Sequence, residues 1–106
     1  MVEMSAQAVR SADVARVCSN PGRLLILSYL YQDGTATWSE ILKFLSSEIG
    51  PVNPNTLHFH LKTLIQVHWI KRSGSEDSPS YTVTKLPNEV IPLLPKIPVQ
   101  SLRKGD

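Results

Sequence analysis

The sequence predicts a mainly α-helical domain with a small β-hairpin and a short C-terminal extension. Two Asn-Pro pairs, at positions 20–21 and 53–54, and one Thr-x-x-Glu box at 37–40 are signals for the start of a helix. Each signal precedes a segment whose apolar residues recur at helical spacing. Two short segments rich in β-branched and aromatic residues follow the last of these helices.

Length and composition fit one globular domain. The chain has 106 residues, of which 42% are hydrophobic and 19% charged, so disordered, collagen-like and disulfide-scaffold classes are excluded. Cys18 is the single cysteine, which excludes an internal disulfide. No apolar run is long enough to cross a bilayer and the N-terminus lacks the apolar region of a signal peptide, so we expect a cytoplasmic protein without a membrane partner.

The first helix is predicted over about residues 5–18. Its apolar face consists of small residues, namely Met4, Ala8, Ala12 and Ala15. Small side chains allow close approach, so residues 1–19 are a candidate dimer contact. Packing of this helix on its own domain is the alternative.

The second helix is predicted from Pro21 to about Gln32, ending at Asp33-Gly34. Its apolar stripe contains Leu24, Ile26, Leu27, Leu30 and Tyr31. Arg23 lies in the first turn, where the helix dipole disfavours a cation. We therefore expect Arg23 to have a partner, and we expect it to form a salt bridge at the edge of the core rather than to contact DNA.

Residues 35–37 predict a short strand, and the box at 37–40 opens a third helix that ends at Gly50-Pro51. The apolar residues of this helix are Ile41, Leu42, Phe44, Leu45 and Ile49. A fourth helix follows over about residues 54–67, with an inward face of Leu57, Leu61, Leu64 and Ile65. Two helices joined by such a short turn form a helix-turn-helix unit.

Strands are predicted at 69–72 and 81–84, with a loop at 73–80 that contains Gly, Ser and Pro. The tip of this hairpin carries Glu76 and Asp77, whose charges oppose contact with phosphate. Four prolines between positions 87 and 98 forbid a long helix but allow one or two turns near residues 88–94.

The order helix, helix, strand, helix, helix, strand, strand is that of a winged helix-turn-helix domain. The segments 23–27, 55–64, 69–72 and 81–84 resemble the ArsR-type winged-helix transcription regulators, in which a Thr-x-x-x-His-Leu-x-x-Leu pattern marks the recognition helix. The pattern begins at Thr56, and the resemblance covers residues 20–86, with 87–106 as a Pro-rich C-terminal extension. It implies a homodimer that binds double-stranded DNA sequence-specifically, with the hairpin 69–84 as the wing.

Helical geometry assigns candidate residues to this function. With its leucines inward, the fourth helix turns Asn55, Phe59 and Lys62 outward and leaves Thr56, His58 and Thr63 at the flanks. These residue types read base edges in the major groove, although Phe59 has the alternative of covering a neighbouring helix. Basic residues at the base of the wing suit phosphate, or are a solvated strand end. The candidate DNA-binding residues are Asn53, Asn55, Thr56, His58, Phe59, Lys62, Thr63, Lys71 and Arg72.

The sequence offers no catalytic or metal-binding pattern. His58 and His60 are two positions apart on a helix and diverge, and cysteine pairs like those of the metal-sensing ArsR-type proteins are absent. We expect His60 to be semi-buried with a hydrogen-bond partner and His58 to be exposed. No enzyme activity, metal, cofactor or small-molecule effector is expected. The alternative function is a winged-helix adaptor that binds proteins, which the acidic hairpin tip favours.

Overall fold

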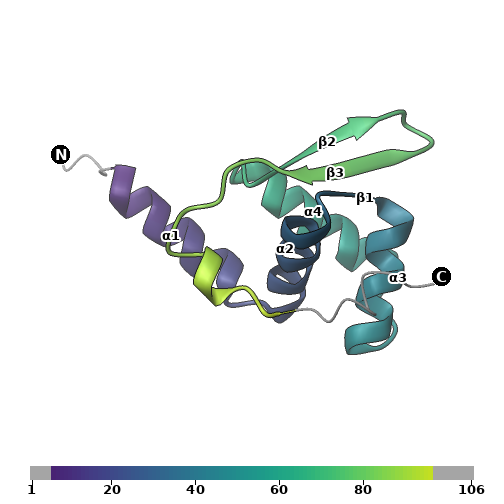
Figure 1. The fold of residues 1–106 in the computed structure, drawn as a ribbon, viewed down its shortest axis with the longest axis horizontal. Helices are drawn as coiled ribbons and strands as arrows, with labels where there is room; N and C mark the ends of the chain where they lie inside the picture. The colour runs from purple at the N-terminus through teal and green to yellow at the C-terminus, as the bar shows by residue number, and fades with distance from the viewer. Residues whose placement is uncertain (1–5, 97–106) are drawn as a thin grey trace.

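The computed structural model describes residues 6–96, with side chains described from residue 12 onward. Its elements are α1 (Ala6–Cys18), α2 (Pro21–Asp33), β1 (Thr35–Thr37), α3 (Trp38–Ile49), α4 (Pro54–Gln66), β2 (Ile70–Gly74), β3 (Pro79–Val83) and a 3-10 turn η1 (Ile91–Leu93). This order, shown in Figure 1, confirms the predicted winged helix-turn-helix architecture.

The predicted capping residues begin three of the four helices. The Asn20 side chain accepts a hydrogen bond from the Arg23 amide at the start of α2. At α3, Thr37 accepts from the Glu40 amide at 3.1 Å while the Glu40 carboxylate accepts from the Thr37 amide at 2.8 Å. The Asn53 side chain begins α4 in the same way. These bonds satisfy amide groups that have no partner inside a helix, so local sequence fixes where each helix begins.

The three strands form one antiparallel sheet in the order β1-β3-β2. β1 pairs with β3 rather than standing alone, which fastens the hairpin to the helical body. The strands of the hairpin reach further than predicted, so its tip is residues 75–78 instead of 73–80. Gly74, at φ 83°, starts this tight turn, and the Ser78 amide closes it on Ser75.

The core lies between the helices and the inner face of the sheet. Its centre includes a stacked pair, Tyr29 and Phe44, whose ring centroids are 4.5 Å apart. The leucines predicted to face inward from α4 are buried. Two predicted core residues are exposed instead, Tyr31 at 49% and Ile49 at 53%. Both lie near the C-terminal end of a helix, where neighbouring elements no longer cover the apolar stripe.

The C-terminal extension packs on the domain. Val90 is fully buried, and the carbonyl oxygen of Pro95 accepts a hydrogen bond from the Ser28 hydroxyl of α2. The turn η1 lies within the region where one or two turns were predicted. On α1, Ala12 and Ala15 are exposed. Met4 and the side chain of Ala8, which complete the predicted small-residue face, lie outside the described residues.

Candidate nucleic-acid interface

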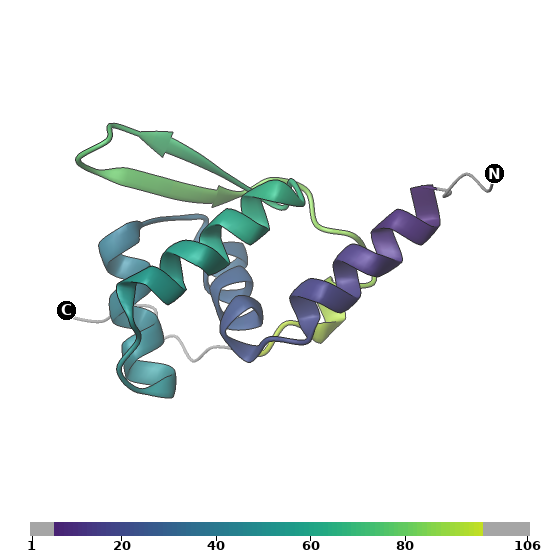
Figure 2. The ribbon, with the colours of Figure 1, turned by 180° about the vertical axis from the view of Figure 1, so that it is seen from behind.

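Helix α4 leaves one long side uncovered by the rest of the domain. Figure 2 shows this helix crossing the front of the molecule, with the hairpin on one side and α3 at its N-terminal end. Its inward leucines, Leu57, Leu61 and Leu64, are at most 2% exposed. The predicted residues that are exposed at its start and along its outer side are Asn53, Asn55, Thr56, His58, Phe59 and Lys62. Six of the nine predicted residues are therefore accessible on this one element.

Thr63 is a correction to the predicted set. Its side chain is only 6% exposed, so it does not reach the outer side of α4. It follows His60 by three positions, and residues at this spacing share a helix face. Because His60 faces the domain, Thr63 faces it too.

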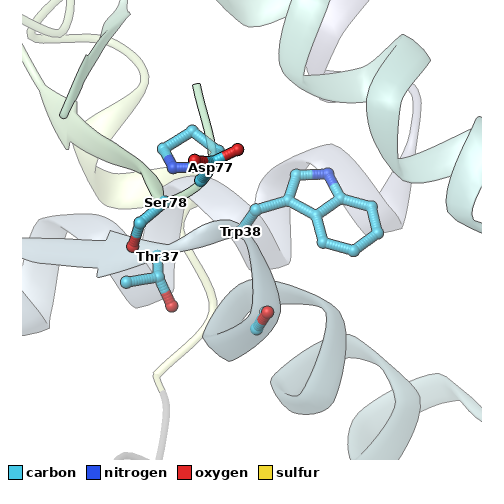
Figure 3. A pocket seen from close by; sticks show the side chains of 6 residues that line it. Thr37, Trp38, Asp77 and Ser78 are labelled. Atoms are coloured by element: carbon cyan, nitrogen blue, oxygen red, sulfur yellow. The ribbon is translucent and has the colours of Figure 1, made fainter. Parts of the chain in front are cut away.

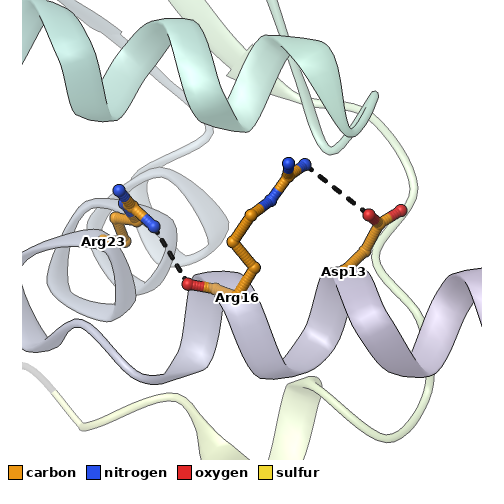
Figure 4. A network of polar contacts seen from close by, with 3 residues as sticks. All are labelled: Asp13, Arg16 and Arg23. Atoms are coloured by element: carbon orange, nitrogen blue, oxygen red, sulfur yellow. Dashed lines mark hydrogen bonds and ion pairs between the residues drawn. The ribbon is translucent and has the colours of Figure 1, made fainter.

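Arg23 connects α4 to the first two helices. Its Nε donates to His60 Nδ1 at 3.1 Å, and its Nη1 donates to the carbonyl oxygen of Arg16 at 2.9 Å (Figure 4). The predicted carboxylate partner is therefore wrong: Arg23 bonds an imidazole and a carbonyl. That carbonyl lies in the last turn of α1, where the helix dipole favours a cation and offsets the unfavourable position at the start of α2. The same figure shows Arg16 paired with Asp13 at the surface, at 3.6 Å.

His60 has the predicted hydrogen-bond partner, but it is buried rather than semi-buried. It is 8% exposed, and its Nδ1 accepts from Arg23, which requires that nitrogen to carry no proton. Burial lowers the pKa of His60 below its usual value, and the neighbouring Arg23 charge lowers it further. The neutral form of His60 thus holds this junction.

Phe59 contacts Arg23 and is still accessible. The guanidinium carbon of Arg23 lies 5.4 Å from the centroid of the Phe59 ring, within cation–π range. The Phe59 side chain nevertheless remains 58% exposed. It therefore covers Arg23 in part and keeps apolar surface available to a partner.

The two basic residues of the wing lie on opposite faces of the hairpin. In the β2–β3 register Arg72 pairs with Tyr81, and Lys71 pairs with Thr82. Successive strand residues point to opposite sides, and the Tyr81 side faces the domain. Arg72 therefore lies beside α4, whereas Lys71 points away from it. The structure brings Arg72 but not Lys71 to the side that α4 exposes.

A pocket of about 330 Å³ lies where α4 meets the hairpin. Apolar residues line it from both elements, namely Leu61, Ile65 and Tyr81. Polar residues border it, namely His58, Lys62 and Arg72, together with Gln66. Sequence reasoning missed Ile65 and Gln66 as site residues. The spacing of His58, Lys62 and Gln66, four residues apart each time, is the signal that reveals this row on α4.

The hairpin tip borders a smaller pocket of about 180 Å³ at the start of α3. Figure 3 shows Thr37 and Trp38 on one side of it and Asp77 and Ser78 on the other. Glu76 and Asp77 are both exposed. The acidic tip predicted from the sequence is thus accessible, and its charges disfavour approach of phosphate at this end of the wing.

Within residues 6–96, no three His, Cys, Asp or Glu residues are grouped as metal ligands would be. None of the described helices combines the length and apolar character needed to span a membrane.

Comparisons with known proteins place the fold. No protein-family profile matches the chain, and no curated protein matches its sequence. Among solved structures it is similar to HlyU from Vibrio cholerae, with 22% identity over 86% of this chain and 90% of HlyU and a TM-score of 0.63. It is also similar to the transcriptional repressor BigR from Xylella fastidiosa, with 22% identity over 83% of this chain and 82% of BigR and a TM-score of 0.63. NolR from Sinorhizobium fredii is 21% identical over 89% of this chain and 90% of NolR, with a TM-score of 0.61. The chain therefore has a winged helix-turn-helix fold similar to that of these structures.

Proposed function

We propose that this protein is a transcription regulator that binds double-stranded DNA sequence-specifically, with α4 in the major groove. The observation that carries this proposal is the outer side of α4, where polar groove-reading side chains are exposed on a winged-helix fold. No Asp or Glu occurs between Glu48 and Glu76, so no carboxylate of α4 or β2 opposes a phosphate.

Each exposed residue of α4 has a role that suits its chemistry. Asn55 is assigned to an adenine edge, Thr56 to a base edge or thymine methyl, and Phe59 to a thymine methyl. Lys62 and His58, further along the helix, are assigned to phosphate or guanine. Asn53 caps the helix with its side-chain oxygen, and its amide nitrogen retains donors for a phosphate.

Arg72 completes the interface from the wing. It borders the same pocket as His58 and Lys62, so a DNA strand lying along α4 meets cations from both elements. Lys71 is assigned no contact there, because it lies on the opposite face of the hairpin. The acidic tip is likewise assigned no insertion into the minor groove.

The proposal includes a homodimer that binds a short pseudo-palindromic site. Winged-helix and other helix-turn-helix dimers place two recognition helices about one helical turn of DNA apart. The exposed Ala12 and Ala15 on α1 support a close contact through this helix. Sedimentation of the full chain measures the dimer independently of DNA.

Selection of bound fragments from a random DNA pool tests the function. We expect an enriched, approximately two-fold symmetric motif, and an affinity that falls steeply with salt because bound phosphates release counterions. A pool that stays random, together with a salt slope near zero, would refute the proposal.

The second candidate is an adaptor domain that binds other proteins. The exposed Phe59 ring and the accessible acidic hairpin tip favour it. A pull-down that recovers a specific partner, from protein that fails to retain duplex DNA, would replace the first proposal with this one.

A further inference from the structure

The pocket between α4 and the hairpin has the construction of a small-molecule site. Its volume of about 330 Å³ falls at the lower end of the range of about 300–1,000 Å³ that ligand sites occupy. Leu61 and Tyr81, at 2% and 4% exposed, belong to the core and give the pocket a fixed apolar floor. Ile65 adds a half-buried apolar wall. Such a site takes an apolar group about the size of one aromatic ring.

The border of the pocket selects the charge of that ligand. Lys62 from α4 and Arg72 from β2 both line it, and none of the residues that line it carries a negative charge. Two cations that share one pocket repel each other, and a bound anion converts this repulsion into attraction. Arginine also binds a carboxylate through two parallel hydrogen bonds. His58 contributes a further polar group at the same border.

We propose that this pocket binds a small organic carboxylate, with an aromatic ring on the apolar floor and the carboxylate between Lys62 and Arg72. The ring displaces water from apolar surface, which supplies affinity. The carboxylate supplies specificity for an anion over a neutral compound of the same shape. The ligand thus joins α4 to the wing.

Competition with DNA follows, and this step rests on the proposed function. Lys62 and Arg72 are both among the residues assigned above to contact DNA. A carboxylate that occupies both side chains neutralises them and lies in the path of the DNA strand. The ligand therefore weakens DNA binding, and the regulator acquires a small-molecule effector.

The first experiment measures the ligand without DNA. Sodium 4-phenylbutanoate is titrated into the full chain at constant ionic strength, and amide chemical shifts are followed by NMR. We expect saturable shifts in the second half of α4 and in β2. Two probes separate the contributions: 4-phenylbutanamide keeps the ring and loses the charge, and acetate keeps the charge and loses the ring. Each should bind at least fivefold more weakly than 4-phenylbutanoate.

Variants test the assigned residues. An exposed ion pair contributes up to about a factor of five in affinity, so the double variant Lys62→Gln/Arg72→Gln, which loses two such pairs, should bind 4-phenylbutanoate several-fold more weakly, by up to about 25-fold. The matched control Lys43→Gln/Lys85→Gln removes the same net charge at exposed positions that do not line the pocket, and should bind like the parent. Ile65→Phe fills the pocket with its own ring and should abolish binding, with thermal unfolding confirming that the variant folds.

The outcomes separate the two proposals. Equal affinity for the carboxylate and the amide, no saturable shift, or an unaffected double variant would overturn the pocket assignment. Displacement of a selected duplex by 4-phenylbutanoate supports competition, and retention of the duplex at saturating ligand overturns that step. If no duplex binds at all, the DNA proposal fails while the NMR titration still decides the pocket.

Discussion

Replacing Arg72 by Gln tests whether α4 and the wing hold one DNA strand together. If Lys62 and Arg72 each neutralise one phosphate per protomer, a dimer makes four such contacts. At about 0.9 per contact, log affinity falls with log salt at a slope of about −3.6. Between 50 and 200 mM salt the parent then loses about 150-fold in affinity. With two contacts removed, Arg72→Gln has a slope of about −1.8 and loses only about 12-fold.

The neighbouring residue supplies the control for this experiment. Lys71→Gln makes the same change in net charge one position away on the same strand, on the opposite face. Its slope should stay within experimental error of the parent slope. Fluorescence polarisation of a selected duplex over a salt series measures all three proteins. Equal salt slopes for the two variants would refute the assignment of Arg72 and Lys71 to different faces, whether or not those slopes differ from the parent slope.

Three other predictions concern the reading helix, the buried histidine and the hairpin turn. Asn55→Ala should relax base preference at one position of the selected motif, costing about 1–3 kcal/mol of discrimination there, and competition between matched and mismatched duplexes measures this. The pKa of His60 is lowered in the folded state, so as pH falls the unfolded chain binds a proton at this histidine before the folded chain does. The contribution of His60 to the free energy of unfolding should therefore be complete above the ordinary histidine pKa of about 6.5 and decline below it. Urea unfolding at several pH values measures that decline, and His60→Gln should have a smaller one. Gly74→Ala should destabilise by at least about 1 kcal/mol, since φ is 83° and the new Cβ would lie 2.6 Å from the Ser78 carbonyl oxygen. Gly34→Ala, which has a positive φ but open space around it, should cost less, and thermal unfolding of both glycine variants measures the difference.

Local signals predicted the elements well because each depends on a few adjacent residues. The caps at Asn20, Thr37 and Asn53 act within three residues of chain, so sequence alone locates the starts of their helices. Hairpin boundaries depend on pairing between distant residues. The pairing of Ser80 with both Ser73 and Thr37, and the closed turn after Gly74, lengthen the strands beyond what alternation of residue types indicates.

The site was predicted in part. Periodicity identified the outer side of α4, but Thr63, predicted at its flank, is buried against the domain. Adjacent positions in a strand lie on opposite faces, which separates Lys71 from Arg72 although the sequence places them side by side. The pocket requires residues from α4, β2 and β3 together, and only the folded chain shows that Gln66 and Tyr81 border the same space. The sequence alone therefore does not indicate this pocket.

The bonds of Arg23 have a consequence for how the first helix is oriented. One planar guanidinium simultaneously reaches the last turn of α1, the imidazole of His60 on α4 and the exposed ring of Phe59, one position before it. A lysine at this position retains the charge but has no fork of donors at fixed angles, so it cannot reproduce this three-way geometry. The direction in which the N-terminal helix leaves the body, and with it the spacing between paired reading helices in a dimer built on that helix, then depends on the shape of a single side chain rather than on its charge.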